Sequence, residues 1–145
     1  MIIDIVSLIL IFIENSLPLD SELMAISLPF ITYIIGKRRN SFCLLLTYIF
    51  MSLQSDRYFF NLFILTAFIA ANYFLFSYIE YSKKVVFYLA ALDLAFYLIF
   101  VLKSFDLIYL LVNLISFIIL NYFYATRKSK KENKWNLINI KEKLY

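Results

Sequence analysis

The sequence predicts an all-α integral membrane protein, a compact bundle of six transmembrane helices with short loops and both termini in the cytoplasm. Two observations predict this class. Of the 145 residues, 63% are apolar and only 17% are charged, whereas a soluble domain is about half apolar and about a quarter charged. Apolar runs also recur along the chain, and basic residues concentrate in every second gap between them.

Six apolar segments are the expected helices. Three reach the roughly 20 residues that a bilayer-crossing helix needs, and these are Tyr58 to Tyr81, Val85 to Leu102, and Leu107 to Thr126. Three shorter segments precede them, namely Ile2 to Ile13, Leu23 to Gly36, and Phe42 to Leu53. A short segment must borrow flanking polar residues, thin the bilayer or be covered by neighbouring helices. One alternative makes the second or third segment a re-entrant hairpin, which a bilayer tolerates only where protein covers it.

The basic residues indicate how the chain is threaded. All 14 Lys and Arg residues except Arg57 and Lys103 follow the second segment, the fourth segment or the last one. The other gaps hold Asp20, Glu22, Asp56 and Asp106. This asymmetry matches the positive-inside rule for an even number of crossings with both ends inside. The candidate cytoplasmic or lipid-contacting residues are Lys37, Arg38, Arg39, Lys83, Lys84, Arg127, Lys128, Lys130 and Lys131.

The chain therefore divides into a six-helix transmembrane domain over residues 1–126 and a basic cytoplasmic tail over residues 127–145. The first apolar segment has no basic residues before it and no small-residue cleavage site after it, so we expect it to stay as a helix. The tail alternates apolar residues with lysines, as in a helix lying on an anionic membrane surface. It is either an anchor for the topology or a docking site for a cytoplasmic partner.

The composition excludes several kinds of chemistry. The chain has no His and a single Cys43, so it lacks a ligand set for zinc or haem and a Cys–His nucleophile pair. Its single Gly36 excludes a phosphate-binding loop and a GxxxG packing motif. Only Asp93 lies centrally in an apolar segment, so no carboxylate dyad is expected. The sequence predicts no enzyme, no catalytic residue, no metal and no cofactor.

Polar residues within the apolar segments are the candidate functional residues, because each costs energy to insert. Asp93 lies mid-segment, where insertion costs roughly 2.5 to 3.5 kcal/mol. It is either a packing contact or a site for an ion, a proton or a substrate. Asn72 lies among alanines that allow close helix approach, and Asn113 and Ser116 share one helix face. We expect Asp93, Asn72 and Asn113 to meet in one polar cluster.

Other polar positions have simpler expectations. Asp4, Glu14 and Glu80 lie near segment ends and are expected to reach water at the membrane interface. Pro29 interrupts the second segment, where it frees a backbone carbonyl and kinks the helix.

The chain combines a small six-segment plan with the step Glu14-Asn15-Ser16-Leu17-Pro18, a basic turn after Gly36, and Gln54-Ser55-Asp56 closing the third segment. In this layout it resembles MreD, the rod-shape-determining membrane subunit of bacteria. Thr47 and Ser52 stand where that family's third helix is glycine-rich. The resemblance implies a non-catalytic scaffold of the inner (cytoplasmic) membrane that serves cell shape and peptidoglycan biosynthesis. It also implies an MreC-like single-span coiled-coil partner and cell-wall elongation proteins, with no nucleic acid and no small-molecule ligand.

Two other classes stay open. A substrate-binding membrane subunit of an energy-coupling-type vitamin importer is also a compact six-helix protein, and it would bind a small molecule through Asp93 and Asn72. A pore former of the holin type is the third class.

Overall fold

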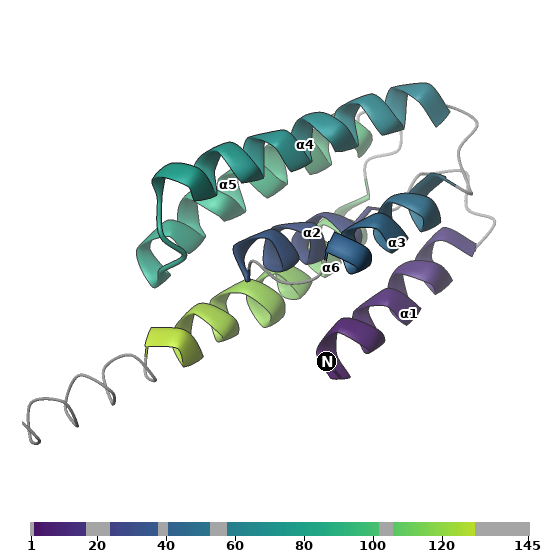
Figure 1. The fold of residues 1–145 in the computed structure, drawn as a ribbon. Helices are drawn as coiled ribbons and strands as arrows, with labels where there is room; N and C mark the ends of the chain where they lie inside the picture. Colours follow the sequence, from purple (N-terminus) through teal and green to yellow (C-terminus); the bar gives the residue numbers. More distant parts are fainter. Residues whose placement is uncertain (1, 17–23, 38–40, 53–57, 102–105, 130–145) are drawn as a thin grey trace, which may run out of the picture.

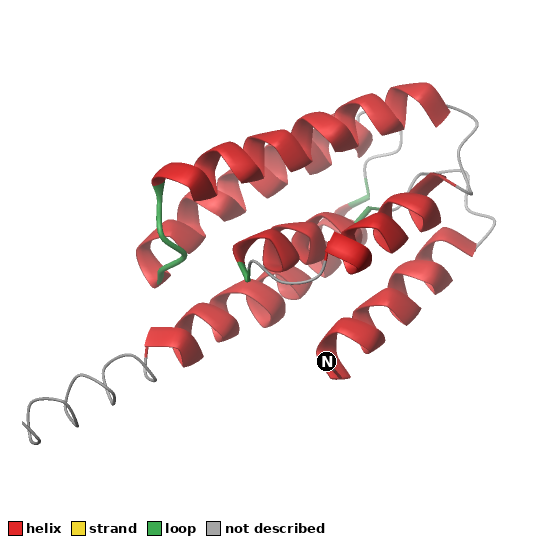
Figure 2. Cartoon of the chain, viewed as in Figure 1, coloured by secondary structure: helices red, strands yellow, loops and turns green. Residues whose placement is uncertain are grey.

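Helices are the regular secondary structure of the described part of the chain. The computed structural model describes residues 2–16, 24–37, 41–52, 58–101 and 106–129, and these contain no strand. The helices are α1 (Ile2–Ser16), α2 (Ser27–Gly36), α3 (Ser41–Ser52), α4 (Tyr58–Tyr78), α5 (Lys83–Val101) and α6 (Leu107–Phe117), with a π-helical turn η1 (Ile118–Tyr122) after α6 (Figures 1 and 2). Helix continues through η1, so Leu107–Ser129 is one element, called here the last helix.

Among the described residues, three helices are long and apolar enough to cross a membrane, namely Phe59–Tyr78, Lys83–Val101 and Leu107–Ser129. These agree with the three longer segments expected from the sequence. The shorter segments also form helices, but α2 begins at Ser27 rather than Leu23, since Met24 is irregular and Ala25 and Ile26 form a turn. The ten residues of α2 extend only about 15 Å, about half the hydrocarbon thickness of a bilayer.

Successive helices run in alternating directions (Figure 1). Lys37, at the end of α2, pairs with Asp4 at the start of α1, and the α2 start contacts Glu14 near the end of α1. The α4–α5 turn and the last turns of the last helix lie beside the end of α2. The start of α1 and the end of the last helix therefore lie at the same end of the bundle. We call it the basic end, defined by Lys37, Lys83, Lys84, Arg127 and Lys128.

Helix α2 forms the centre of the bundle. All its residues from Ser27 to Ile35 are buried, and it packs on α3, α4, α5, α6 and η1. A short helix is stable there because neighbouring helices rather than lipid surround it, and protein covers the irregular residues at its start. Met24 and Ala25 in that irregular stretch are 3% and 1% exposed.

Helix α1 has the reverse pattern of a soluble amphipathic helix. Its buried positions are Asp4, Ser7, Ile11, Glu14 and Asn15, so a mostly polar stripe faces inward. Its large apolar side chains, Ile5, Ile9 and Phe12 among them, are about half exposed. A soluble helix turns its polar face to water, so this orientation favours an apolar surrounding.

Candidate functional site

The buried start of α2 is the focus of the polar interactions inside the bundle. Pro29 has no N–H and cannot donate to the carbonyl four residues earlier, which belongs to Ala25. The Asn113 side chain of α6 supplies the missing bond, since its Nδ2 donates to the Ala25 carbonyl oxygen at 3.2 Å. Pro29 therefore leaves the Ala25 carbonyl without a backbone donor, as expected. A side chain of another helix supplies the donor instead. Pro29 is the third residue of α2, so it lies in the first turn, where a proline is tolerated, and it does not interrupt the helix as the sequence suggested.

A second asparagine of the last helix holds α2 one turn further on. Asn121, in the π-helical turn, donates from Nδ2 to the Pro29 carbonyl oxygen at 3.0 Å. Its Oδ1 accepts a hydrogen bond from the Tyr81 hydroxyl at 2.6 Å. Asn121 is fully buried and joins α2, the last helix and the α4–α5 turn.

The sequence interpretation did not single out Asn121, because the direction of its side chain toward α2 depends on the π-helical turn. Eight residues separate Asn113 from Asn121, which places them about 80° apart around a regular α-helix. A π-helical turn takes up an extra residue, and this brings both amides toward α2. The asparagine itself was visible in the sequence, but its register was not.

Glu14 of α1 also contacts the start of α2. Its Oε1 accepts from the backbone N–H of Ile26 at 3.2 Å, and its Oε2 accepts from the Ser27 hydroxyl at 3.3 Å. A carboxylate at a helix N-terminus bonds unpaired N–H groups and complements the helix dipole. Glu14 is 8% exposed and Asp4 is 7% exposed. The expectation that these two carboxylates reach water is therefore wrong, whereas Glu80 is exposed as expected.

Asp93 lies in α5 beside the Asn113 side chain, as the expected polar cluster requires. It is 1% exposed. The Asn113 Nδ2 is bonded to Ala25, and neither Asp93 carboxyl oxygen has a hydrogen-bond partner within the described part of the chain. The Asn113 Oδ1 and the Tyr97 hydroxyl, one turn along α5 from Asp93, are also buried without a partner there. Buried polar atoms of this kind call for a proton, a water molecule or a ligand to satisfy them.

The rest of the expected cluster is not brought together by any hydrogen bond. Asn72 is fully buried, but its Nδ2 donates to the Phe68 carbonyl in its own helix at 3.0 Å. Ser116 is only half-buried. Glu14, in contrast, lies within electrostatic range of Tyr97. Asp93 is therefore not the only buried carboxyl of the described residues, although Asp4 and Glu14 lie near the two ends of α1.

At the basic end, Lys37 is tied into the bundle. Its Nζ lies 3.2 Å from Asp4 Oδ1 and donates to the Tyr33 hydroxyl at 2.9 Å. Burial lowers the pKa of Lys37, but the bonds to Tyr33 and Asp4 outweigh this and raise the pKa above its ordinary value. Lys83, Lys84 and Arg127 are exposed and Lys128 is half-buried. Arg38, Arg39, Lys130 and Lys131, and the tail beyond residue 129, lie outside the described residues.

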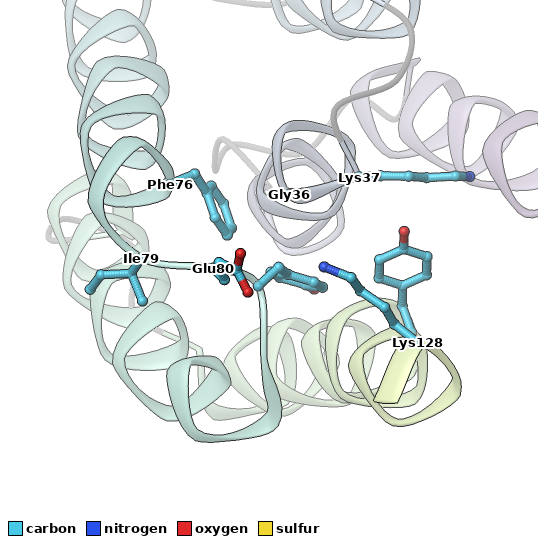
Figure 3. Close-up of a pocket in the computed structure, with 8 residues that line it drawn as sticks. Gly36, Lys37, Phe76, Ile79, Glu80 and Lys128 are labelled. Atoms are coloured by element: carbon cyan, nitrogen blue, oxygen red, sulfur yellow. The ribbon is translucent and has the colours of Figure 1, made fainter. Parts of the chain in front are cut away.

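A pocket of about 220 Å³ opens between α2, the α4–α5 turn and the last helix at this end (Figure 3). Gly36 lines it, and a Cβ there would lie 2.9 Å from two ring atoms of Tyr81. The Tyr81 ring stacks on Phe76 and Tyr124 with centroids 5.3 and 5.5 Å apart. Burial, together with Tyr124 and Tyr33, raises the pKa of the Tyr81 phenol well above its ordinary value, so it stays a neutral donor to Asn121. Glu80 and Lys128 also line the pocket, and both are drawn in Figure 3.

Within the described residues, the secondary structure is helical, three helices are long and apolar enough to cross a membrane, and several polar side chains are buried between the helices. No three His, Cys, Asp or Glu side chains of the described residues come together as a metal site. Comparison of the chain with protein-family models, with curated proteins and with solved structures found no match.

Proposed function

We propose that this chain is a multi-pass, non-catalytic scaffold of the bacterial cytoplasmic membrane, of the MreD type. The observation that carries the proposal is the division between interior and surface. Polar side chains of α1 and the last helix bond to α2. The outward faces of α1, α3, α4, α5 and α6 carry large apolar side chains. Such a bundle is a rigid apolar body whose contacts are made with lipid and with other membrane helices.

In this proposal the chain crosses the bilayer six times and both termini are cytoplasmic. The basic end then faces the cytoplasm, in line with the preference of Lys and Arg for that side. The shortness of α2 is no obstacle, because protein surrounds it and the longer helices set the thickness of the domain.

The mechanism is helix-to-helix contact. Helix α1 offers a candidate surface for a single-span coiled-coil partner of the MreC type, because its large apolar side chains point outward and its described packing is concentrated on α3. The partner's extramembrane part would connect to peptidoglycan elongation enzymes. Helices associate in lipid by close packing and occasional hydrogen bonds, so this role needs no catalytic residue.

Purification from native membranes tests the proposal. The full-length tagged protein is extracted gently, and the proteins that accompany it are identified by mass spectrometry, with an unrelated six-helix membrane protein as control bait. We expect a single-span coiled-coil protein together with cell-wall elongation enzymes. Recovery of a pair of ATPases with a transmembrane coupling subunit would contradict the scaffold.

One observation favours a second candidate, the membrane subunit of an energy-coupling-type importer. The unpartnered oxygens of Asp93, Asn113 and Tyr97 are the kind of polar groups that orient a small molecule in a pocket. This candidate predicts a small molecule that co-purifies with the protein and is lost in Asp93→Leu. The scaffold predicts no such molecule.

A further inference from the structure

A second cavity lies at the basic end, beside Tyr33 and Arg127. It has a volume of about 320 Å³, and Tyr124 lines both cavities. Its lining is mostly apolar: Ile3 of α1, Tyr33 of α2, and Ile119, Leu120 and Phe123 of the last helix, with Arg127 at the end. We call it the α1–α6 groove.

The floor and walls of the groove differ in exposure. Tyr33 and Leu120 are 3% and 8% exposed and form the floor, where the Tyr33 and Tyr124 rings meet edge to face with centroids 5.4 Å apart. Ile3, Ile119 and Phe123 are about half exposed and form the walls. The groove is thus an apolar trough open on the outer surface of the bundle.

The charge at the groove is positive. Arg127 is exposed and lines the groove at its basic end. The nearest carboxylate on α1, Asp4, is buried and paired with Lys37, so its charge is compensated. An anionic group at the mouth of the groove would therefore meet Arg127 without repulsion from Asp4. Arginine suits a phosphate because its planar guanidinium donates two parallel hydrogen bonds.

We propose that the α1–α6 groove binds an anionic phospholipid, with one acyl chain along the apolar walls and the headgroup phosphate on Arg127. A bilayer surrounds the helices, so the groove is filled by lipid unless another helix covers it. Basic sites between membrane helices on the cytoplasmic side are known to bind anionic headgroups. The inference rests on membrane embedding of the helices and not on the scaffold role.

Photo-crosslinking in lipid nanodiscs tests this proposal. The full-length protein is reconstituted with a phosphatidylglycerol or a phosphatidylcholine that carries the same diazirine-labelled acyl chain, and labelled peptides are mapped by mass spectrometry. We expect phosphatidylglycerol to label the groove walls more strongly than phosphatidylcholine. Arg127→Gln should lower the phosphatidylglycerol labelling about fivefold, the factor for about 1 kcal/mol per basic residue near an anionic surface. It should leave the phosphatidylcholine labelling unchanged.

Three matched variants sharpen the result. Lys84→Gln removes an exposed basic residue of the same end outside the groove and should change nothing. Ile119→Trp should block the labelling of the walls by both lipids. Ile115→Trp, equally exposed on the same helix but outside the groove, should not. Equal labelling by the two lipids with no effect of Arg127→Gln would overturn the proposal, as would groove walls protected from both lipids in the complex purified from native membranes.

Discussion

The bond from Asn113 to the Ala25 carbonyl is needed only because residue 29 is a proline. Asn113→Leu keeps a side chain of similar size and removes the donor that satisfies this buried carbonyl. Leaving a buried acceptor unsatisfied costs about 1–3 kcal/mol in general. Hydrogen bonds between membrane helices average about 0.6 kcal/mol, with a maximum of about 1.7 kcal/mol. We expect Asn113→Leu to lower the free energy of unfolding by about 1–2 kcal/mol, since Pro29 leaves the Ala25 carbonyl without a helical donor.

The same substitution should cost less when residue 29 regains its N–H. In Pro29→Ala the backbone N–H at position 29 can donate to the Ala25 carbonyl, as in any helix. We therefore expect a coupling of about 1 kcal/mol between positions 29 and 113 in a double-mutant cycle. Asn72→Leu is the matched control, because its side chain bonds Phe68 in its own helix and should not couple to Pro29.

The assay is the reversible unfolding of the four proteins of the cycle in bicelles, by steric trapping. If Asn113→Leu lowers the free energy of unfolding equally in the wild-type and the Pro29→Ala backgrounds, the role assigned to this bond is refuted. A large coupling between positions 29 and 72 would show that the effect is general loosening of the bundle.

Three further predictions concern other contacts. Gly36→Ala places a Cβ 2.9 Å from the fixed Tyr81 ring and should destabilise the bundle by about 1–3 kcal/mol, as overpacking does; an unchanged melting temperature would contradict this. Asp4→Asn breaks the pair with Lys37 and should cost about 1–3 kcal/mol at pH 7, between the values for exposed and buried pairs. Because the pKa of Lys37 is raised, the wild-type advantage over Asp4→Asn at neutral pH should persist up to pH 10.5 and fall as the pH rises beyond it. Under the scaffold proposal Asp93→Asn should preserve cell shape in a complementation assay, and loss of function at normal membrane abundance would instead favour a ligand or proton site.

The helices could be predicted where the apolar run in the sequence is long enough by itself to define a membrane helix. The two long helices α4 and α5 begin and end within three residues of the expected segments, because long apolar runs between charged turns leave little choice in a bilayer. The sequence placed the start of the second helix too early. The Leu23 to Ile26 stretch is apolar, but Met24 is irregular and Ala25 and Ile26 form a turn, which hydropathy does not distinguish from helix.

The candidate site was only partly predictable, because tertiary contacts decide it. Asp93 and Asn113 could be named from the sequence because inserting a polar side chain into a bilayer costs free energy. The structure places these two residues next to each other. Glu14 and Asp4 were assigned to the interface by their place near segment ends, whereas their spacing puts them on the buried face of α1. Asn121 reaches α2 through a π-helical turn, and no propensity in the sequence marks where that turn falls.

Topology mapping is the decisive test of the proposed six-crossing bundle with its basic end in the cytoplasm. Reporter proteins fused after Arg39, Lys84 and Tyr145 should be active as cytoplasmic reporters, and fusions after Asp20, Asp56 and Asp106 as external ones. This alternation is expected for six crossings with both termini in the cytoplasm. An external reporter at Tyr145, or a cytoplasmic one at both Asp20 and Asp56, would contradict the six crossings.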